Sequence, residues 1–513
     1  MSTNELIEGP CKKTMQFTDA QIPYFFRQGA IIPYNPATVM NVTERPDKLI
    51  LNVVAGSNGE GSIYEDDGDN ADYVSNSAVY RLYLNDKTHS PYSIEHPENY
   101  LSERAINRRK RQGIAIDSTD LPVSPTYINE IKAKGLTIMG TSRWHNTITV
   151  ASTTDDVARV VKGLPCVKSC LRLYKSPDSL VVLPPEKVGK LSPIDSTTSS
   201  EYGDGFRQIN LINGTGLHAA GFKGKGMLIA IIDAGFRNAD KIGALNANIK
   251  STADFAPRRA SSIFTEHYHG TMVLSVMAAN KRNVFIGTAP EADYALIRSE
   301  DTDTETRAEE DSWTTAVEFA DSIGADLINS SLGYSHWDGD SIGPHLRDLN
   351  GHTAYISQTA SMLAPKGIVL CNSAGNEGSS TWHKINVPAD ADDILTIGAI
   401  DFRKKSTTFS SIGPSQDGRV KPDVCGPGKS VYVIDASGMT TTNSGTSFAS
   451  PIVCGMTACL WQALPELNAK QIISVVRQSA DRWQWPDNIY GYGVPDYAKA
   501  LSIGNKMVNE NRK

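Results

Sequence analysis

Five short apolar segments, each ending in small or polar residues, most strongly constrain the fold of this 513-residue chain. They follow one another from about residue 203 onward, as MLIAIIDAG, DYALIRS, ADLINSSLG, GIVLCNSAGN and ILTIGAI. Continuous apolar strands are typical of strands buried on both faces, and such strands form parallel sheets that are covered by helices. The pattern therefore predicts an α/β domain, with a parallel sheet flanked by helices, over residues 203–505.

The residues that end these segments are the first candidates for chemistry, because ligands of open parallel sheets bind outside the carboxyl ends of the strands. Asp233 ends one segment in IIDAGF, and Asn376 follows another in CNSAGNEG. His269 begins a helical pattern in HYHGTMVLSVMAAN, where Gly270 allows another part of the chain to approach closely. Taken alone, each of these three side chains is more simply explained as a cap, a turn or a structural histidine.

A fourth candidate, Ser447, lies in NSGTSFASP at residues 443–451. The stretch holds more small polar residues than a helix cap requires, and the apolar run IVCGMTACLWQAL after it predicts a buried helix. A serine at a helix start has a free backbone N–H where the helix dipole favours negative charge. Small residues such as Gly445 and Ala449 keep the approach open, and Pro451 is expected in the first turn.

Asp233, His269 and Ser447 together supply the groups that a nucleophilic serine needs. A serine hydroxyl is a weak nucleophile until a base removes its proton, and a carboxylate that fixes the tautomer of the base assists it. Asp233 is then the orienting group, His269 the base and Ser447 the nucleophile. The side-chain N–H of Asn376 is suited to stabilise an oxyanion. The chain order Asp, His, Ser is one of three recurrent orders of such a triad.

The motifs IIDAGF, HGTMV, AGNEG and GTSFASP, in this order, resemble those of the subtilisin-like serine peptidases, or subtilases. The resemblance implies a serine endopeptidase, with the catalytic roles already assigned to Asp233, His269 and Ser447 and the oxyanion role to Asn376. Met272 stands where that family commonly has histidine.

His267 also precedes the helix, and we prefer His269 as the base because only His269 is followed by Gly-Thr. The resemblance further implies that NSSLG, residues 329–333, is an edge strand against which an extended peptide substrate pairs. The substrate-binding residues expected on this basis are Ser331, Leu332, Gly333 and Gly375.

Residues 80–175 have a different pattern, with strands such as VYRLYLND and NTITVAS among helices such as SPTYINEIKAKG. The pattern predicts a small α+β sandwich. YRLYLNDK, LSERAINRRKRQGI, DLPVSPTYI and SRWHNTITV resemble the N-terminal region of secreted Bacteroidetes-type subtilases. That resemblance implies a ferredoxin-like propeptide domain, an intramolecular partner that assists folding and caps the active site. The basic run RRKR, residues 108–111, is interpreted as a solvated helix face.

Residues 1–79 are rich in short β-like runs, and KLILNVVAG and GSIYEDDG can pair as a hairpin. RQGAIIPY and GSIYEDDGD resemble the C-terminal β-domain of family 31 glycoside hydrolases, although that family's catalytic barrel of about 250 residues has no room here. We therefore expect a fused segment that is dispensable for proteolysis. Residues 176–202, rich in Pro, Ser and Thr, are expected to be a linker, and residues 506–513 a tail.

Composition excludes several other classes of function. A net charge of −7 argues against a nucleic-acid partner, because such partners reward a basic surface. No apolar run approaches the roughly 20 residues that span a bilayer, and residues 1–16 lack the apolar core of a secretory signal. An extracellular or periplasmic location is therefore expected from the family resemblance alone.

No cofactor is predicted from the sequence. The seven cysteines are scattered without a CxxC pair, which argues against a disulfide framework and a structural zinc site. Calcium sites are frequent in the resembled family, but no compact Asp/Asn loop of this sequence is assigned to one.

Two alternatives to a peptidase remain at this point. One is a catalytically silent subtilase fold that binds peptides, which a serine-directed fluorophosphonate probe would distinguish. The other is a carbohydrate-binding protein or glycosidase led by residues 1–79.

Overall fold

The computed structural model describes residues 78–154, 156–175, 200–338 and 343–512, and the backbone of six short strands before residue 78. Those strands are β1 (Lys13–Gln16), β2 (Tyr24–Arg27), β3 (Ala30–Pro33), β4 (Val39–Val42), β5 (Val53–Ala55) and β6 (Gly61–Ile63). They pair antiparallel as β1–β4, β2–β3 and β5–β6. The pair β5–β6 is the hairpin that the sequence predicts.

The chain divides into two compact units, residues 1–103 with 116–181 and residues 104–115 with 182–513. The smaller unit has the chain order β7, α2, β8, β9, α3, β10 and the sheet order β10-β7-β9-β8, with every pair antiparallel. Its elements are β7 (Ala78–Leu84), α2 (Pro125–Lys132), β8 (Thr137–Ser142), β9 (Thr147–Ser152), α3 (Val157–Val161), β10 (Val167–Lys175) and the 3₁₀ turn Pro97–Asn99. The two helices pack Ile131 and Val157 against the sheet, which is the predicted α+β sandwich in the ferredoxin-like order.

The larger unit is built on a seven-stranded sheet in the order β12-β15-β11-β16-β17-β18-β19, all parallel. The strands are β11 (Leu228–Asp233), β12 (Ile249–Asp254), β15 (Asp293–Arg298), β16 (Leu327–Ser330), β17 (Val369–Ser373), β18 (Leu395–Ile400) and β19 (Val424–Pro427). Every residue of β11, β16, β17, β18 and β19 is buried. The five apolar segments are therefore strands of the predicted parallel sheet.

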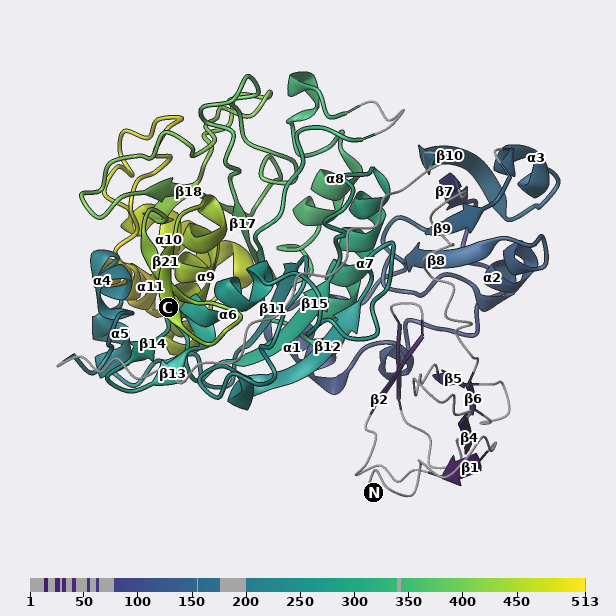
Figure 1. The fold of residues 1–513 in the computed structure, drawn as a ribbon, viewed down its shortest axis with the longest axis horizontal. Helices are drawn as coiled ribbons and strands as arrows, with labels where there is room; N and C mark the ends of the chain where they lie inside the picture. The colour runs from purple at the N-terminus through teal and green to yellow at the C-terminus, as the bar shows by residue number, and fades with distance from the viewer. Residues whose placement is uncertain are drawn as a thin grey trace. The chain divides into compact units, whose positions relative to one another are not determined.

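Helices cover both faces of this sheet, as Figure 1 shows for α6 and α9 on one side and α7 and α8 on the other. The helices of the unit are α1 (Glu103–Arg111), α4 (Phe206–Leu211), α5 (Thr215–Ala219), α6 (His269–Ala278), α7 (Ala308–Ile323), α8 (Tyr355–Ser361), α9 (Thr446–Ala463), α10 (Ala469–Ser479) and α11 (Tyr497–Asn511). Small hairpins β13–β14 (Asn280–Lys281, Phe285–Ile286) and β20–β21 (Val431–Ile434, Thr440–Asn443) and 3₁₀ turns at Asn246–Asn248 and Leu346–Asp348 complete it. The apolar helix α9 packs on β16, β17, β18 and β19 and forms the centre of the core.

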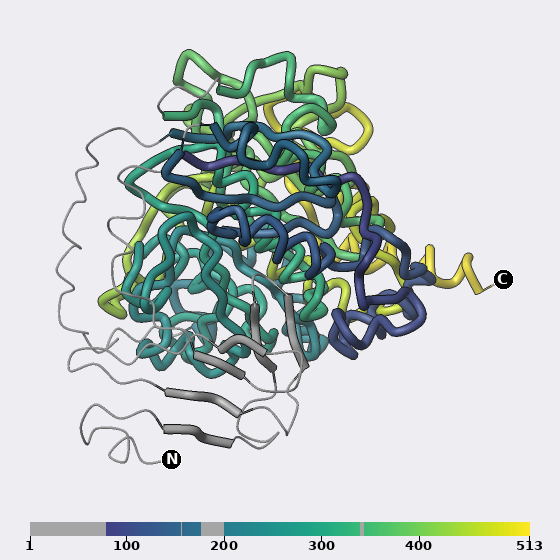
Figure 2. Tube along the Cα trace, turned by 90° about the vertical axis from the view of Figure 1, so that its right-hand side faces the viewer, coloured from purple at the N-terminus to yellow at the C-terminus, as the bar shows by residue number. Residues whose placement is uncertain are grey.

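One domain boundary and the interpretation of RRKR differ from the expectations. Figure 2 shows the last turns of α11 projecting from the larger unit, so the boundary predicted after residue 505 falls inside a helix. Most of the predicted linker, and the side chains of residues 1–77, lie outside the described residues. The interpretation of RRKR as a solvated face is wrong, because Arg108 and Arg109 are buried and only Lys110 and Arg111 are exposed.

Candidate active site

Asp233 and His269 meet where a strand ends and a helix begins. Asp233 is the last residue of β11 and is fully buried, and His269 is the first residue of α6. The Nδ1 atom of His269 lies 2.9 Å from Oδ1 and 3.1 Å from Oδ2 of Asp233. Gly270 makes this approach possible, since a Cβ there would lie 2.4 Å from the carbonyl oxygen of Gly235. The two side chains that the sequence analysis assigns as orienting group and base thus lie within hydrogen-bond distance of each other.

Opposing effects act on the pKa of His269. Burial would lower the pKa of the imidazole, but the charge of Asp233 and its hydrogen bond raise it, and the net shift is upward from 6.5. His267 is placed differently: its Nδ1 accepts the backbone N–H of His269, and its ring stacks on Tyr268. Among the two histidines, the structure pairs only His269 with Asp233.

Ser447 lies in the first turn of α9 and is almost fully buried. Its hydroxyl donates to the carbonyl of Ser331, 3.4 Å away, and the ring of the next residue, Phe448, lies 5.7 Å from the ring of His269. The first N–H groups of a helix have no intrahelical acceptor. Thr446 N is bound by Asn376 and Phe448 N by the carbonyl of Gly445, while Ser447 N has no partner among the described residues.

Pro451 lies inside α9 beyond its first turn, so the expected first-turn position is wrong. Because proline has no N–H, the carbonyl of Ser447, four residues earlier, loses its helical donor. The hydroxyl of Ser331 replaces that donor at 2.9 Å. Asn329 in turn donates to Ser331 at 3.1 Å and accepts from Ser450 at 2.9 Å. Sequence reasoning missed this locking of the helix start, although a proline four residues after Ser447 was the signal for it.

Asn376 is exposed beside the same helix start. Its Oδ1 accepts from both the N–H and the hydroxyl of Thr446, each at 3.0 Å. The orientation of the amide is therefore fixed, and its Nδ2 has no partner among the described residues. Gly375 precedes it with a φ of +107°, and a Cβ there would lie 2.8 Å from Ser411 Oγ, so local packing itself requires glycine.

The expected edge strand at residues 329–333 is wrong for Asn329 and Ser330. Both belong to β16, which pairs with β11 on one side and β17 on the other, so no edge is open there. Ser331, Leu332 and Gly333 lie beyond the end of β16. The carbonyls of Leu332 and Gly333 accept side-chain amides of Asn372 and Asn386, each at 3.4 Å.

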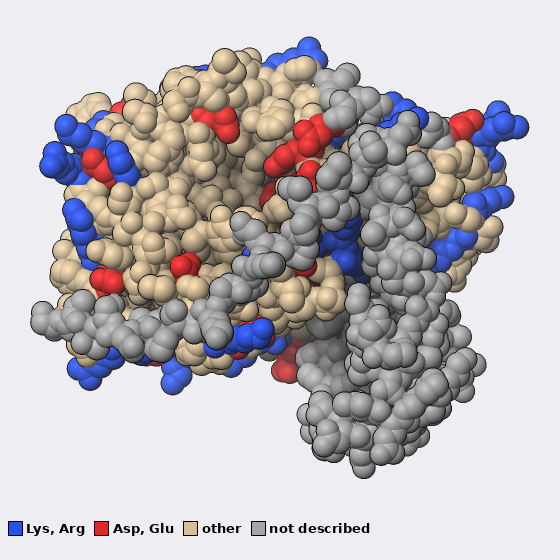
Figure 3. Space-filling model, in the orientation of Figure 1, with Lys and Arg blue, Asp and Glu red and all other residues tan. Residues whose placement is uncertain are grey.

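A group of acidic side chains follows β15 and was also missed by sequence reasoning. Burial raises the pKa of Glu300 well above 4.5, and the charges of Glu305 and Asp233 add to the shift. The hydroxyl of Tyr334 donates to Glu300 at 2.9 Å, just after the segment that ends at Gly333. Figure 3 shows Asp and Glu residues gathered beside a hollow in this face of the larger unit. The acidic run SEDTDTE at residues 299–305 was the available signal.

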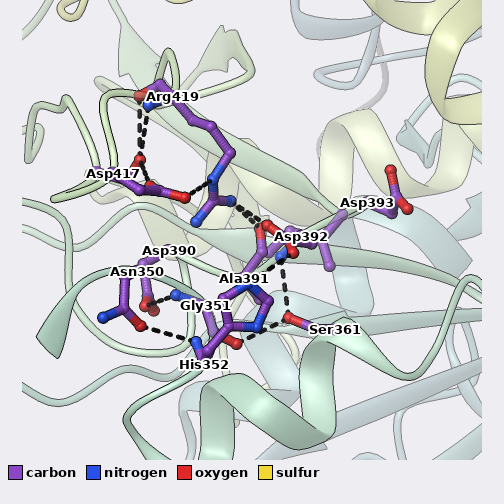
Figure 4. Close-up of polar contacts among 12 residues, drawn as sticks. Asn350, Gly351, His352, Ser361, Asp390, Ala391, Asp392, Asp393, Asp417 and Arg419 are labelled. Carbon is purple, nitrogen blue, oxygen red and sulfur yellow. Dashed lines mark hydrogen bonds and ion pairs between the residues drawn. The ribbon is translucent and has the colours of Figure 1, made fainter.

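The polar cluster at residues 390–393 is structural (Figure 4). Asp390 accepts the N–H of Gly351 at 2.7 Å, and Asp392 pairs with Arg419 at 2.7 Å and with His352 at 3.2 Å. These carboxylates are thus occupied by groups of the protein. Over the described ranges, no cluster of three or more His, Cys, Asp or Glu side chains is placed to hold a metal ion. The six cysteines in these ranges are free.

The helices in the described part of the chain include none long and apolar enough to cross a membrane.

Two family profiles match this chain: the subtilase family (Peptidase S8) over residues 224–493 and the Bacteroidota Peptidase S8 propeptide domain over residues 79–181. Subtilisin DY of Bacillus licheniformis is 32% identical over 270 residues, covering 52% of this chain and 87% of that protein. Subtilisin NAT of Bacillus subtilis subsp. natto is 28% identical over 267 residues, covering 52% and 63%.

A crystal structure of the epidermin leader peptide processing serine protease from Staphylococcus aureus shares the fold. Its TM-score is 0.58 at 18% identity, and the match covers 84% of this chain and 99% of that one. The two family profiles cover residues 79–181 and 224–493, so they give no support to the glycoside hydrolase resemblance of residues 1–79.

Proposed function

Because this chain belongs to the subtilase family of serine endopeptidases, we propose that it hydrolyses peptide bonds through an acyl-enzyme on Ser447. The observation that carries the proposal is the Asp233–His269 pair at the carboxyl end of β11, beside the start of α9. In this mechanism His269 removes the hydroxyl proton of Ser447 while Oγ attacks the substrate carbonyl carbon. His269 then donates that proton to the leaving amine, and water releases the acyl group by the reverse steps.

The oxyanion of the tetrahedral intermediate accepts hydrogen bonds from the backbone N–H of Ser447 and from Nδ2 of Asn376. Both donors lack other partners among the described residues, and Thr446 fixes the amide of Asn376 before substrate arrives. Preorganised donors of this kind stabilise charge that develops only in the transition state.

The substrate class that fits is an extended peptide lying along Ser331, Leu332 and Gly333 beyond the end of β16. Gly375 would contact it through the backbone. The Bacteroidota propeptide match supports three further parts of the proposal. Residues 80–175 assist folding and cap the active site until the connection at 176–202 is cut on maturation, and the enzyme acts outside the cytoplasm.

Ser447→Ala tests the nucleophile. The expected loss in kcat is about a millionfold, a magnitude known from subtilisin itself, with an unchanged fold by circular dichroism. Ser444→Ala, an exposed serine of the same stretch, is the matched control and should keep its activity and its labelling by a fluorophosphonate probe. Full activity of Ser447→Ala would refute the mechanism. A folded wild-type enzyme that neither cleaves peptides nor takes the probe would instead be a silent peptide-binding protein.

Asn376→Leu tests the oxyanion donor. We expect kcat to fall by about 10² to 10³ with KM little changed, again the size of effect measured in subtilisin. Thr446→Val removes one of the two bonds that hold Asn376 and should lower kcat by a smaller factor. A rise in KM at normal kcat would assign Asn376 to substrate binding.

A further inference from the structure

Residues 104–115 belong to the propeptide region by sequence and to the larger unit by structure. They lie inside the sequence matched by the propeptide profile, residues 79–181. They nevertheless group with residues 182–513 as one compact unit, separately from the rest of the propeptide region. We call residues 104–115 the arginine segment, because α1 places four arginines there, at positions 104, 108, 109 and 111.

The centre of the contact is a buried ion pair with Asp321 in the last turn of α7. Arg108 donates from Nη2 to Asp321 Oδ1, and Arg109 donates from Nη2 to Oδ1 and Oδ2 at 2.9 and 3.0 Å. The exposed fractions of the three side chains are 1%, 1% and 0%. Burial lowers the pKa of Arg108 to about 10, opposed by the charge of Asp321, so the guanidinium remains charged at neutral pH.

The arginines also supply hydrogen-bond donors to the carbonyls at the carboxyl end of α7. A helix leaves its last carbonyls without intrahelical donors, and its dipole favours cations there. Arg108 Nη1 donates to the carbonyl of Ala325 at 2.7 Å, and Arg104 Nε donates to the carbonyl of Gly324 at 2.9 Å. Asp321 is an anion at the end of a helix that disfavours anions, so the arginines compensate both the side chain and the dipole.

A second set of contacts ties the arginine segment to the sheet. The carboxylate of Asp326, directly before β16, accepts from Arg104 and, at 3.0 Å, from Arg111, and it also accepts the N–H of Leu228 at the start of β11. Gln112 donates to the carbonyl of Gly367 at 2.8 Å and accepts the N–H of Ala469 at 2.9 Å. The segment is thus held at the points where β11, β16 and β17 begin.

This position is opposite to the candidate active site. Asp233 ends β11, whereas the arginine segment contacts the residues that precede that strand. A six-residue strand rises about 20 Å, so the two ends of β11 are separated by roughly that distance. The arginine segment therefore leaves the carboxyl ends of the strands free for substrate.

We propose that Asp321, Asp326, Gly367 and Ala469 form a permanent docking site for the arginine segment, which stays bound after the chain is cut between residues 176 and 202. The working enzyme is then an assembly of the peptidase domain with a fragment of its own propeptide region. Removing one partner of a buried ion pair leaves an uncompensated charge, which opposes release. The docking does not depend on the role proposed for Ser447.

Retention is tested on the full chain with Ser447→Ala, which prevents self-digestion. A recognition sequence for a site-specific protease is inserted after Lys190, and the cut protein is captured through a C-terminal tag. We expect the N-terminal fragment to remain bound through size-exclusion chromatography and in 0.5 M NaCl, since buried pairs are little screened by salt. Loss of that fragment in buffer, with the peptidase domain still folded, would overturn the proposal.

Variants separate the docking site from any other contact of the propeptide region. The double variant Arg108→Met with Arg109→Met should weaken retention at least about tenfold and lower Tm by roughly 5–10 °C. Lys110→Met, an exposed residue of the same helix, is the matched control and should change neither. Amide exchange of residues 318–328 should rise only in the double variant. Unchanged retention in the double variant would overturn the proposal.

A milder variant covers the case in which the double variant fails to fold. Gln112→Ala removes two hydrogen bonds and no charge. We expect the cut fragment to leave a few times faster, with Tm reduced by a few degrees. Release and Tm equal to those of the Lys110→Met control would show that this anchor does not hold the segment.

Discussion

The two ends of α7 bury acidic side chains in opposite ways. In the last turn, Asp321 is held by Arg108 and Arg109, and all three side chains are almost inaccessible. In the first turn, Glu309 is 1% exposed, and its Oε1 has no hydrogen-bond partner within the described residues. The same helix therefore offers a compensated and an uncompensated buried carboxylate for direct comparison.

The lack of a counter-charge at the first turn of α7 is reflected in the pKa of Glu309. Burial raises the pKa of Glu309 well above 4.5, and the nearby carboxylates Glu300, Glu305 and Asp301 raise it further. This end therefore lacks the counter-charge that Arg108 and Arg109 supply at the other end. The helix dipole favours an anion at the first turn, but it is too weak to replace a counter-charge there, since its effect is about 0.3–1 kcal/mol. Burial of a charge is thus determined by its partners more than by its place on the helix.

The largest expected effect is the loss of the compensated pair. Asp321→Asn leaves Arg108 and Arg109 buried without their anion, and we expect the free energy of unfolding to fall by about 3–5 kcal/mol. Glu309→Gln, at the other end of α7, should cost little or stabilise the protein at pH 8, because it removes a charge that has no cation beside it. Urea unfolding in the Ser447→Ala background measures both.

The exposed pair Arg512–Glu466, 2.6 Å apart, supplies the control for that comparison. Glu466→Gln should change the free energy of unfolding by no more than about 1 kcal/mol, as is usual for surface pairs. An equal loss for Asp321→Asn and Glu309→Gln would contradict the distinction between the two ends of α7.

The second expected effect is a pH dependence of the free energy of unfolding, which comes from the acidic group near the first turn of α7: Glu300, Glu305 and Glu309. Burial raises the pKa of Glu305 to about 7, opposed by His336 and reinforced by Asp338. The folded state then holds this proton more tightly than the unfolded state, whose value is near 4.5. The stability due to this proton is full below pH 4.5 and is lost as the pH rises to about 7. We expect Glu305→Gln to be more stable than the wild type by on the order of 1–3 kcal/mol at pH 8 and equal to it at pH 4.

Urea midpoints measured from pH 4 to pH 8 test this sign. The other titratable groups that face Glu305, namely Glu300, Glu309, His336 and Asp338, remain in the variant, so part of the wild-type slope should persist. The same slope in both proteins would place the titration on these other groups and not on Glu305. A variant that loses stability at pH 8 would show that the charge of Glu305 is compensated.

The strands and the Asp–His pair could be predicted because their signals are local. Each apolar segment is short enough to identify from its own residues, and Asp233 and His269 directly follow a strand and begin a helix. The start of α9 was predicted for the same reason, since a cluster of small polar residues before an apolar run is typical of a helix start.

The misinterpreted features depend on partners far away in the sequence. RRKR is a charged run in any local window, and its counter-charge Asp321 lies 213 positions from Arg108 in the sequence. The position of Pro451 is tolerated because Ser331, which comes from another strand end, supplies the missing hydrogen bond. The edge-strand prediction failed at Asn329 because strand neighbours follow from topology, which the motif itself does not contain.

The smallest expected effect concerns the hydroxyl of Tyr334, which contacts the acidic group near the first turn of α7. It donates to Glu300 at 2.9 Å and lowers the pKa of that carboxyl, against the dominant effect of burial. Tyr334→Phe should cost about 1 kcal/mol, the usual net contribution of a hydrogen bond. The loss should grow with pH, because the hydroxyl stabilises the ionised carboxylate more than the neutral acid.

Tyr294→Phe is the matched control, since Tyr294 donates at 2.7 Å to the carbonyl of Ala289, an acceptor that does not titrate. Urea unfolding of both variants at pH 5 and pH 8 distinguishes them. A pH-independent loss in Tyr334→Phe would mean that Glu300 keeps one protonation state across this range, and the pH dependence of stability near the first turn of α7 would then come from Glu305 and Glu309.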